Sequence, residues 1–502
     1  MTSVSSRSYT IPSEIVRNKA GYDLNSIFAI VNILICASGV YVYHIKGNNQ
    51  YVDGYTILLL FIFGAQNILM LLYEKKKRDP FVLLLVIGAS IFYMGRTVTL
   101  LYDPWSAPLN ASAYIPDDLN YSLIFIIFSN TSIFMGLSMA GGKIIYKKDN
   151  PAEYPAKPRN VIIILLIAMG VAFFIGYADN VIGRLSGYIT NNFFRLFVIV
   201  LFTFIYVALH FRKTSITNIS IIFFSLGIFV IMLTLSGSRS GIFALVYLSL
   251  IAFLSVNGRI TLNNHFILTA LILAFLSVIL FTSATYIRGV LGTERKTFSS
   301  KELSIVDIGD VLGSQEITTL VRPIFDRLGF LDYATVVIIN HEKYSKIINF
   351  TYYCKSIIDN VLTPGFNVFE VPRVSHAMSY IARGEPLPTL EDITTAYQAD
   401  MPTIYGEYYV LFQGYPALII LFVFSYVFKK IYLSIRSKDT FLFYLYRALV
   451  LYIFYLWLNS FGIDWLMLDI TGIIITVFLF KRFYKMKKSK LKPSNSVVES
   501  SH

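Results

Sequence analysis

Charge and cysteine are both scarce in this sequence. Only 15% of the 502 residues are charged, and only two are cysteines. A charged fraction this low is unusual for a soluble globular protein of this length. Cys36 lies in an apolar run and Cys354 in a long polar stretch, so we expect neither a disulfide between them nor a zinc site. Packing must therefore hold the chain together.

The pattern of a cleavable leader is also not found in the first part of the sequence. The stretch before Leu24 is polar and contains Glu14. A secretory signal peptide needs an apolar core of about 7–15 residues, which this stretch lacks. We therefore expect no signal peptide here.

What the sequence has in abundance is long apolar runs. Hydrophobic residues make up 55% of the chain, aromatic residues 16%, and the mean hydropathy is +0.61. A run of about 20 apolar residues suffices to cross a bilayer as a helix. The sequence predicts an all-α polytopic membrane protein with about twelve transmembrane helices, near residues 24–44, 52–73, 81–101, 120–140, 160–178, 192–211, 217–235, 240–257, 266–286, 405–428, 440–458 and 463–481.

The formal net charge of +13 comes from basic residues on one side of the predicted membrane. These include the cluster at 75–78, Arg212 with Lys213, and the tail from Lys481 to Lys492. Basic loops face the cytoplasm, so an even number of spans places both termini there. The basic excess is thus a topology signal, and we expect no binding to nucleic acid.

This topology divides the chain into four parts. Transmembrane helices one to nine occupy 1–286, a long extracytoplasmic (periplasmic) loop occupies 287–404, helices ten to twelve occupy 405–482, and a basic cytoplasmic tail occupies 483–502. Because the loop has no disulfide, it must be held by its own packing and by docking on the membrane helices.

Unusual charges gather at the predicted outer face. The stretch LTLSGSRSGIF puts Arg239 in a Ser/Gly-rich turn, where backbone N–H groups and a planar guanidinium can meet a phosphate or carboxylate. A single interfacial arginine commonly snorkels to the headgroups. Several unusual charges at one face instead predict a polar, cationic cavity; the others are Arg96, Arg195, Arg288, Glu407, Asp464 and Asp469.

The long loop adds further candidates. Residues 320–341 predict a helix with Pro323 at its first position. The nearby Arg322 and Arg327 would make its N-terminus an anion site, unless Asp326 pairs with one of them. Arg373 and His376 are three residues apart, the spacing that shares a helical face. A loop histidine is otherwise structural or solvated.

These residue types suit glycosyl transfer from a pyrophosphate-linked substrate. Arginines and backbone N–H groups stabilise the charge that develops on a leaving pyrophosphate. The attacking sugar hydroxyl needs a base, for which the candidates by type are Glu407, Asp469, Asp464 and His376. No acidic cluster on the outer face has metal-ligand spacing, so we expect no metal and no cofactor.

Three motifs in order give the chain a family resemblance. They are SGSRSG at 236–241, RPIFDRLGFLDYA at 322–334, and MPTIYGEYYVLFQGYPALIILFVF at 401–424. From about 217 to 430 the chain resembles the bacterial O-antigen polymerases, the Wzy-type oligosaccharide repeat-unit polymerases of the GT-C superfamily. One departure is Gln413, which stands where that family usually has glycine.

The resemblance implies an activity and its partners. Such enzymes transfer a growing glycan from undecaprenyl pyrophosphate onto a new lipid-linked repeat unit at the outer face of the cytoplasmic membrane, without a metal. Partners would be these lipid-linked oligosaccharides, membrane lipid, and a chain-length regulator and flippase of the same pathway. Arg239 and Arg327 match the family motifs and would hold the anionic substrate, and position alone adds Arg288, Arg322 and Arg373.

Two rival functions remain open from the sequence. An O-antigen ligase, which hands the glycan to lipid A-core, has the same many-span plan and long outer loop; the segment around Glu407 favours the polymerase. A polysaccharide transporter or flippase also fits twelve spans. Such folds usually have related halves and substrate groups at the membrane midplane, whereas here the halves look unrelated.

Overall fold

A computed structural model describes residues 24–74, 79–102, 115–142, 195–196, 198–207, 239–256, 329–362, 368–383, 386–387, 403–437, 439–459, 462–464, 466–467, 469–474, 477–478 and 482. Every regular element in these ranges is a helix. The chain is therefore an all-helical protein in its described parts, as the sequence predicts.

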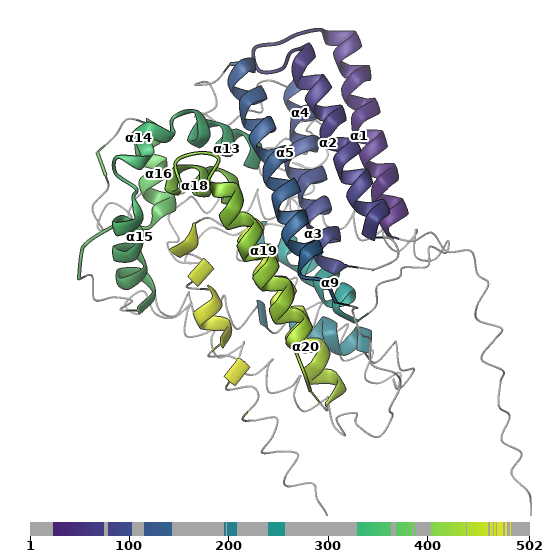
Figure 1. The fold of residues 1–502 in the computed structure, drawn as a ribbon, viewed down its shortest axis with the longest axis vertical. Coiled ribbons are helices and arrows are strands. Elements are labelled where there is room, and N and C mark those ends of the chain that lie inside the picture. The colour runs from purple at the N-terminus through teal and green to yellow at the C-terminus, as the bar shows by residue number, and fades with distance from the viewer. Residues whose placement is uncertain are drawn as a thin grey trace, which may run out of the picture.

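Six described helical segments are long and apolar enough to cross a membrane. They match the first four and the tenth and eleventh predicted spans (Figure 1): α1 (Leu24–Lys46), α2 (Gly54–Glu74), α3–η1–α4 (Pro80–Gly88, Ala89–Met94, Gly95–Tyr102), α5 (Pro116–Met139), α19 (Ala417–Ser434) and α20 (Thr440–Leu458). Helix α9 (Arg239–Val256) and a shorter apolar helix, Val198–Val207, lie in two further predicted spans. The other predicted spans fall wholly or partly outside the described residues, so the count of twelve stays a prediction.

The third span is one rod with a π-helical turn, η1, in its middle. It begins where Asp79 accepts the backbone N–H of Phe81 at 3.0 Å and Pro80 occupies the first helical turn. A capping carboxylate and a proline at this position both favour helix initiation. The Asp79 carboxylate also pairs with Lys429 of α19, so this end of the span carries a neutralised, buried charge.

Helices α5 and α19 cross at very short distance through Gly136. A Cβ built on Gly136 would lie 2.3 Å from the backbone oxygen of Phe422 and 2.2 Å from the Ser425 hydroxyl. Only glycine allows this approach. Lipid supplies no hydrophobic driving force between membrane helices, so their association depends on close van der Waals packing. Small residues allow the helix backbones to approach that closely.

The described helices of the long loop gather beside α5 and α19, on the left of the view in Figure 1. They are α13 (Phe330–Ile339), α14 (His341–Ser345), α15 (Phe350–Ile357), η5 (Ile358–Leu362) and α16 (Val374–Arg383), together with α18 (Thr403–Leu411). They share an apolar core: Val337, Tyr344, Ile348, Tyr352, Tyr353, Val374, Ala377, Met378, Ile381 and Val410. The predicted helix over 320–341 is described only from Phe330, and it ends at Ile339.

The predicted tenth span, 405–428, is two helices. α18 ends at Leu411 and α19 begins at Ala417. Between them Gln413 (φ 52°) and Gly414 (φ 102°) are left-handed, and the Gly414 N–H donates to the Tyr409 carbonyl at 2.8 Å. This is a helix C-cap that normally uses glycine. Gln413, the departure from the family pattern, therefore occupies a backbone position that glycine would adopt with less strain.

Candidate functional site

Glu407 lies on α18 and is completely buried. Its Oε1 accepts the backbone N–H of Ile463 at 2.7 Å. The neighbouring Gly406 lets α18 lie against α13, because a Cβ there would be 3.1 Å from the Val337 side chain and 3.5 Å from Ala334 Cα. Gly406 thus allows α18 to pack closely on α13, and the adjacent Glu407 places a buried carboxylate against the chain that follows α20.

Asp464 is the second buried carboxylate at this place. Its Oδ2 accepts the Ser356 hydroxyl at 2.8 Å and the Val374 N–H at 3.0 Å. Val374 is the first residue of α16, so the carboxylate sits where the helix dipole favours negative charge. Asp464 therefore ties α15 and α16 to the segment that follows α20.

Glu407 and Asp464 flank the same backbone position, and we refer to them as the acidic pair. Between them lies Gly462, with φ 143°. A Cβ built on Gly462 would be 2.8 Å from Asp464 Oδ1 and 3.7 Å from Glu407 Oε1. Glycine is required here both by the backbone conformation and by the space that the carboxylates fill.

Two tyrosines of α15 complete the surroundings of the acidic pair. Burial, together with the nearby charges of Glu407 and Asp464, holds the pKa of Tyr353 well above its usual range. Burial and Asp464 likewise raise the pKa of Tyr352, whose hydroxyl donates to the Pro372 carbonyl at 2.7 Å. Both phenols therefore keep their protons at physiological pH and can donate hydrogen bonds.

His376 and Arg373 lie at the start of α16, close in sequence to the residue that Asp464 holds. His376 is only 2% exposed, whereas Arg373 is partly exposed. Arg373 lies just before the helix rather than on it, and its carbonyl accepts the Ala377 N–H. The two predicted residues are thus neighbours at one helix end, near the acidic pair.

Asp469 is not bound to the acidic pair but to Arg195. The Arg195 Nη1 and Asp469 Oδ2 atoms are 2.6 Å apart. Both side chains keep some exposure, 20% and 14% respectively. An aspartate already paired with a guanidinium is a poor proton acceptor, so the structure favours Glu407 over Asp469 as a base.

The arginines expected to hold substrate fall mostly beyond the described ranges. Arg288, Arg322 and Arg327 lie outside them, and Arg239 is described only as the first residue of α9. Asp332, from the same motif as Arg327, forms a buried ion pair with Arg96, Nε to Oδ2 2.8 Å. That pair fastens the loop helix α13 to the third span.

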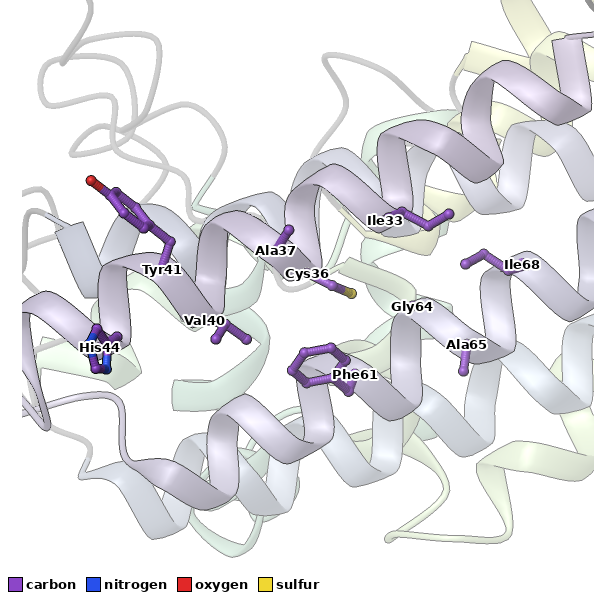
Figure 2. Close-up of a pocket in the computed structure, with 10 residues that line it drawn as sticks. All are labelled: Ile33, Cys36, Ala37, Val40, Tyr41, His44, Phe61, Gly64, Ala65 and Ile68. Carbon is purple, nitrogen blue, oxygen red and sulfur yellow. The ribbon is translucent and has the colours of Figure 1, made fainter.

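No group of three or more potential metal ligands occurs among the described residues. A cavity of about 660 Å³ lies between α1 and α2 (Figure 2), and its walls are almost entirely apolar, with His44 at one end. None of its lining residues belongs to the acidic pair or to its neighbours. Several of them, including Ile33 and Phe61, are exposed in the isolated chain, as expected for helices that face lipid.

Sequence reasoning missed several contributors to this site. Ser356, Tyr353 and Gly462 contact the carboxylates, yet a serine, tyrosine or glycine in an apolar chain gives no local signal of such a role. Asp464 was a candidate from its depth in the twelfth predicted span. Its partners could not be predicted, because they come from helices about 90 to 108 residues earlier in the chain.

Comparison with protein-family models, with curated proteins and with solved structures finds no match to this chain. The fold itself defines the class, which is a multi-pass helical membrane protein.

Proposed function

We propose that the protein is a polymerase of undecaprenyl-pyrophosphate-linked oligosaccharide repeat units, an O-antigen or capsule polymerase of the cytoplasmic membrane. It would act at the outer face as a metal-independent glycosyltransferase, with the lipid pyrophosphate as leaving group. The proposal rests on the motif resemblance and on one structural observation. The motif glutamate Glu407 is buried beside a second carboxylate, where the loop helices dock on the membrane helices.

This observation supports a base with a fixed position. A sugar hydroxyl attacks only as its proton leaves, and a carboxylate held by a backbone hydrogen bond is preorganised for that transfer. The contact from Ile463 occupies Oε1. Because Glu407 is completely buried, the acceptor sugar would reach it only when the loop helices move away from the membrane helices. Arginines of the outer loops, Arg239 and Arg327 first among them, would hold the pyrophosphate.

Two other functions remain alternatives. A ligase would use the same leaving group and a similar base, and would differ only in its acceptor, lipid A-core. The acidic pair does not favour a polysaccharide flippase. A transporter usually places its substrate-binding groups near the membrane midplane. In the predicted topology, the acidic pair instead lies where the loop meets the outer ends of the spans.

Deletion of the gene, followed by electrophoresis of surface polysaccharide, separates these functions. A polymerase predicts that the ladder collapses to core plus one repeat unit. Loss of every attached repeat would identify a ligase, and accumulation of lipid-linked repeats on the cytoplasmic side would identify a flippase. An unchanged ladder would contradict all three.

A further inference from the structure

A second polar group lies inside the membrane bundle, built around the Arg195–Asp469 ion pair. Two tyrosines, Tyr247 of α9 and Tyr452 of α20, lie close enough to Arg195 to interact with it electrostatically. The ring of Tyr247 stacks on Tyr455, with centroids 4.4 Å apart and planes at 21°, and lies nearly parallel to Tyr452 at 6.4 Å and 14°. Three aromatic faces and one ion pair therefore meet where α9, α20 and residues 195 and 469 come together.

The depth of this group follows from helix geometry. A helix rises about 1.5 Å per residue. Tyr455 is then about 4.5 Å, Tyr452 about 9 Å and Tyr247 about 12 Å from the helix ends that the predicted topology places outside. The group therefore lies in the outer leaflet, one to two turns below the surface on which the proposed reaction occurs.

Partial exposure of the group points to a ligand. Arg195 and Asp469 are 20% and 14% exposed, and Tyr247 and Tyr455 are partly exposed, whereas Tyr452 is buried. Charged atoms facing hydrocarbon are costly, and polar residues at such a depth commonly line a water-filled or substrate-filled space. The Arg96–Asp332 pair, by contrast, is almost completely buried.

The chemistry of the group selects among ligand classes. Asp469 cancels the charge of Arg195, so the group has no net attraction for an anion such as pyrophosphate. A lipid tail would leave the guanidinium and carboxylate without polar contacts. A sugar ring suits both the ion pair and the tyrosine rings. Its hydroxyls can form hydrogen bonds with Arg195 and Asp469, while its C–H face lies on the Tyr247 or Tyr455 ring.

We propose that Arg195, Asp469, Tyr247 and Tyr455 form a binding subsite for an uncharged sugar ring, distinct from the acidic pair. The inference deepens the proposed function, because a polymerase must hold two glycans at once. In that reaction the subsite would hold one glycan by its sugars, while the acidic pair serves the reacting hydroxyl. No bond is made or broken at the subsite.

The test uses the full chain, purified in lipid nanodiscs. The probe is the oligosaccharide released by mild acid from the cell's own surface polysaccharide and then treated with phosphatase, so that it carries neither lipid nor phosphomonoester. Its affinity is measured by calorimetry or by saturation-transfer NMR. Tyr247→Phe and Tyr455→Phe keep the aromatic face and should stay within about threefold of the unmodified protein, whereas Tyr247→Leu and Tyr455→Leu should bind about five- to tenfold more weakly.

Tyr446→Leu is the matched control, because Tyr446 is on the same helix, α20, near its cytoplasmic end. It should bind like the unmodified protein. Equal affinity in the Phe and Leu variants, or no binding by the unmodified protein, would overturn the subsite. If a Leu variant does not fold, Asp469→Asn takes its place: it leaves Arg195 charged, so oligosaccharide binding should fall about fivefold and binding of inorganic pyrophosphate should rise. Unchanged binding of both probes also overturns the subsite.

Failure of the subsite and failure of the proposed function give different results. If gene deletion collapses the ladder but the Phe and Leu variants bind with equal affinity, the polymerase function is supported and the subsite is contradicted. If the ladder is unchanged but the Leu variants bind the oligosaccharide more weakly, the polymerase function is contradicted and the sugar site is supported.

Discussion

The Oε1 atom of Glu407 accepts the backbone N–H of Ile463 at 2.7 Å, which joins α18 to the chain after α20. The same carboxylate is the proposed base, so it has two separable roles. As a hydrogen-bond acceptor it holds the loop on the membrane helices. As a carboxylate it can take a proton, which an amide cannot.

Glu407→Gln should separate these two roles. The amide oxygen can still accept from Ile463, so we expect normal protein abundance, while loss of the base should lower polymerisation by about 10²- to 10⁴-fold. The measurement is polymer yield from lipid-linked repeats, with the amount of folded protein determined alongside. Asp464→Asn is the matched control: the Ser356 hydroxyl and the Val374 N–H both donate to this side chain and need only an acceptor, so the variant should keep far more activity. Full activity in the Gln variant would reduce Glu407 to a structural contact.

The Arg96–Asp332 pair should be essential for docking of α13. Both side chains are 1% exposed or less, and removing one partner of such a buried pair costs about 3–5 kcal/mol. Arg96→Leu and Asp332→Leu should each lower the thermal midpoint sharply, and the double variant should cost less than the two single losses combined. The exposed Arg436, replaced by alanine, is the control and should change little. Strictly additive losses would mean that the two charges do not stabilise each other.

Gly136→Ala should destabilise the bundle. The added methyl would meet the Phe422 backbone oxygen at 2.3 Å, which a rotamer change cannot relieve. We expect a loss of about 1–3 kcal/mol, measured as a lower thermal midpoint in detergent. Gly88→Ala is the matched control, because nothing lies within 4 Å of its added methyl; in a helix interior it should be neutral or slightly stabilising. Equal behaviour of the two variants would contradict the close crossing of α5 and α19.

The native cysteines can test the topology, because no cysteine has to be introduced on the predicted outer side. Cys354 is exposed on α15 and Cys36 is buried on α1. An impermeant thiol reagent should label intact spheroplasts once, and Cys354→Ser should remove that label. In the Cys354→Ser background, Ser437→Cys, which is on the predicted cytoplasmic side, should react only after lysis. Labelling of residue 437 from outside would reverse the orientation.

The sequence predicted the six described membrane-crossing segments well, because the length of an apolar run is a local property. It did not predict the break between α18 and α19. Residues 405–428 are mostly apolar apart from Glu407 and Gln413, and the left-handed cap at Gln413 and Gly414 depends on backbone geometry. The π-turn in the third span is likewise invisible in its composition.

For the candidate site, residue type and predicted position make Glu407, Asp464 and His376 candidates, and their roles stay predictions. Their partners depend on tertiary contacts. Asp469 illustrates the limit: its type suggested a base, but its neighbour Arg195 lies 274 residues earlier in the chain and neutralises it. No periodicity or motif connects two such positions.

The ion pair between Arg96 and Asp332 also imposes an order on biogenesis. The two residues are 236 positions apart. At about 5–20 residues per second, Arg96 enters the membrane on the order of ten to fifty seconds before its partner has been synthesised. In the predicted topology, Asp332 must then cross to the outside before it can pair. During that interval the third span carries an uncompensated arginine, so the half-made protein depends on water, lipid headgroups or the insertion machinery to keep that helix in place.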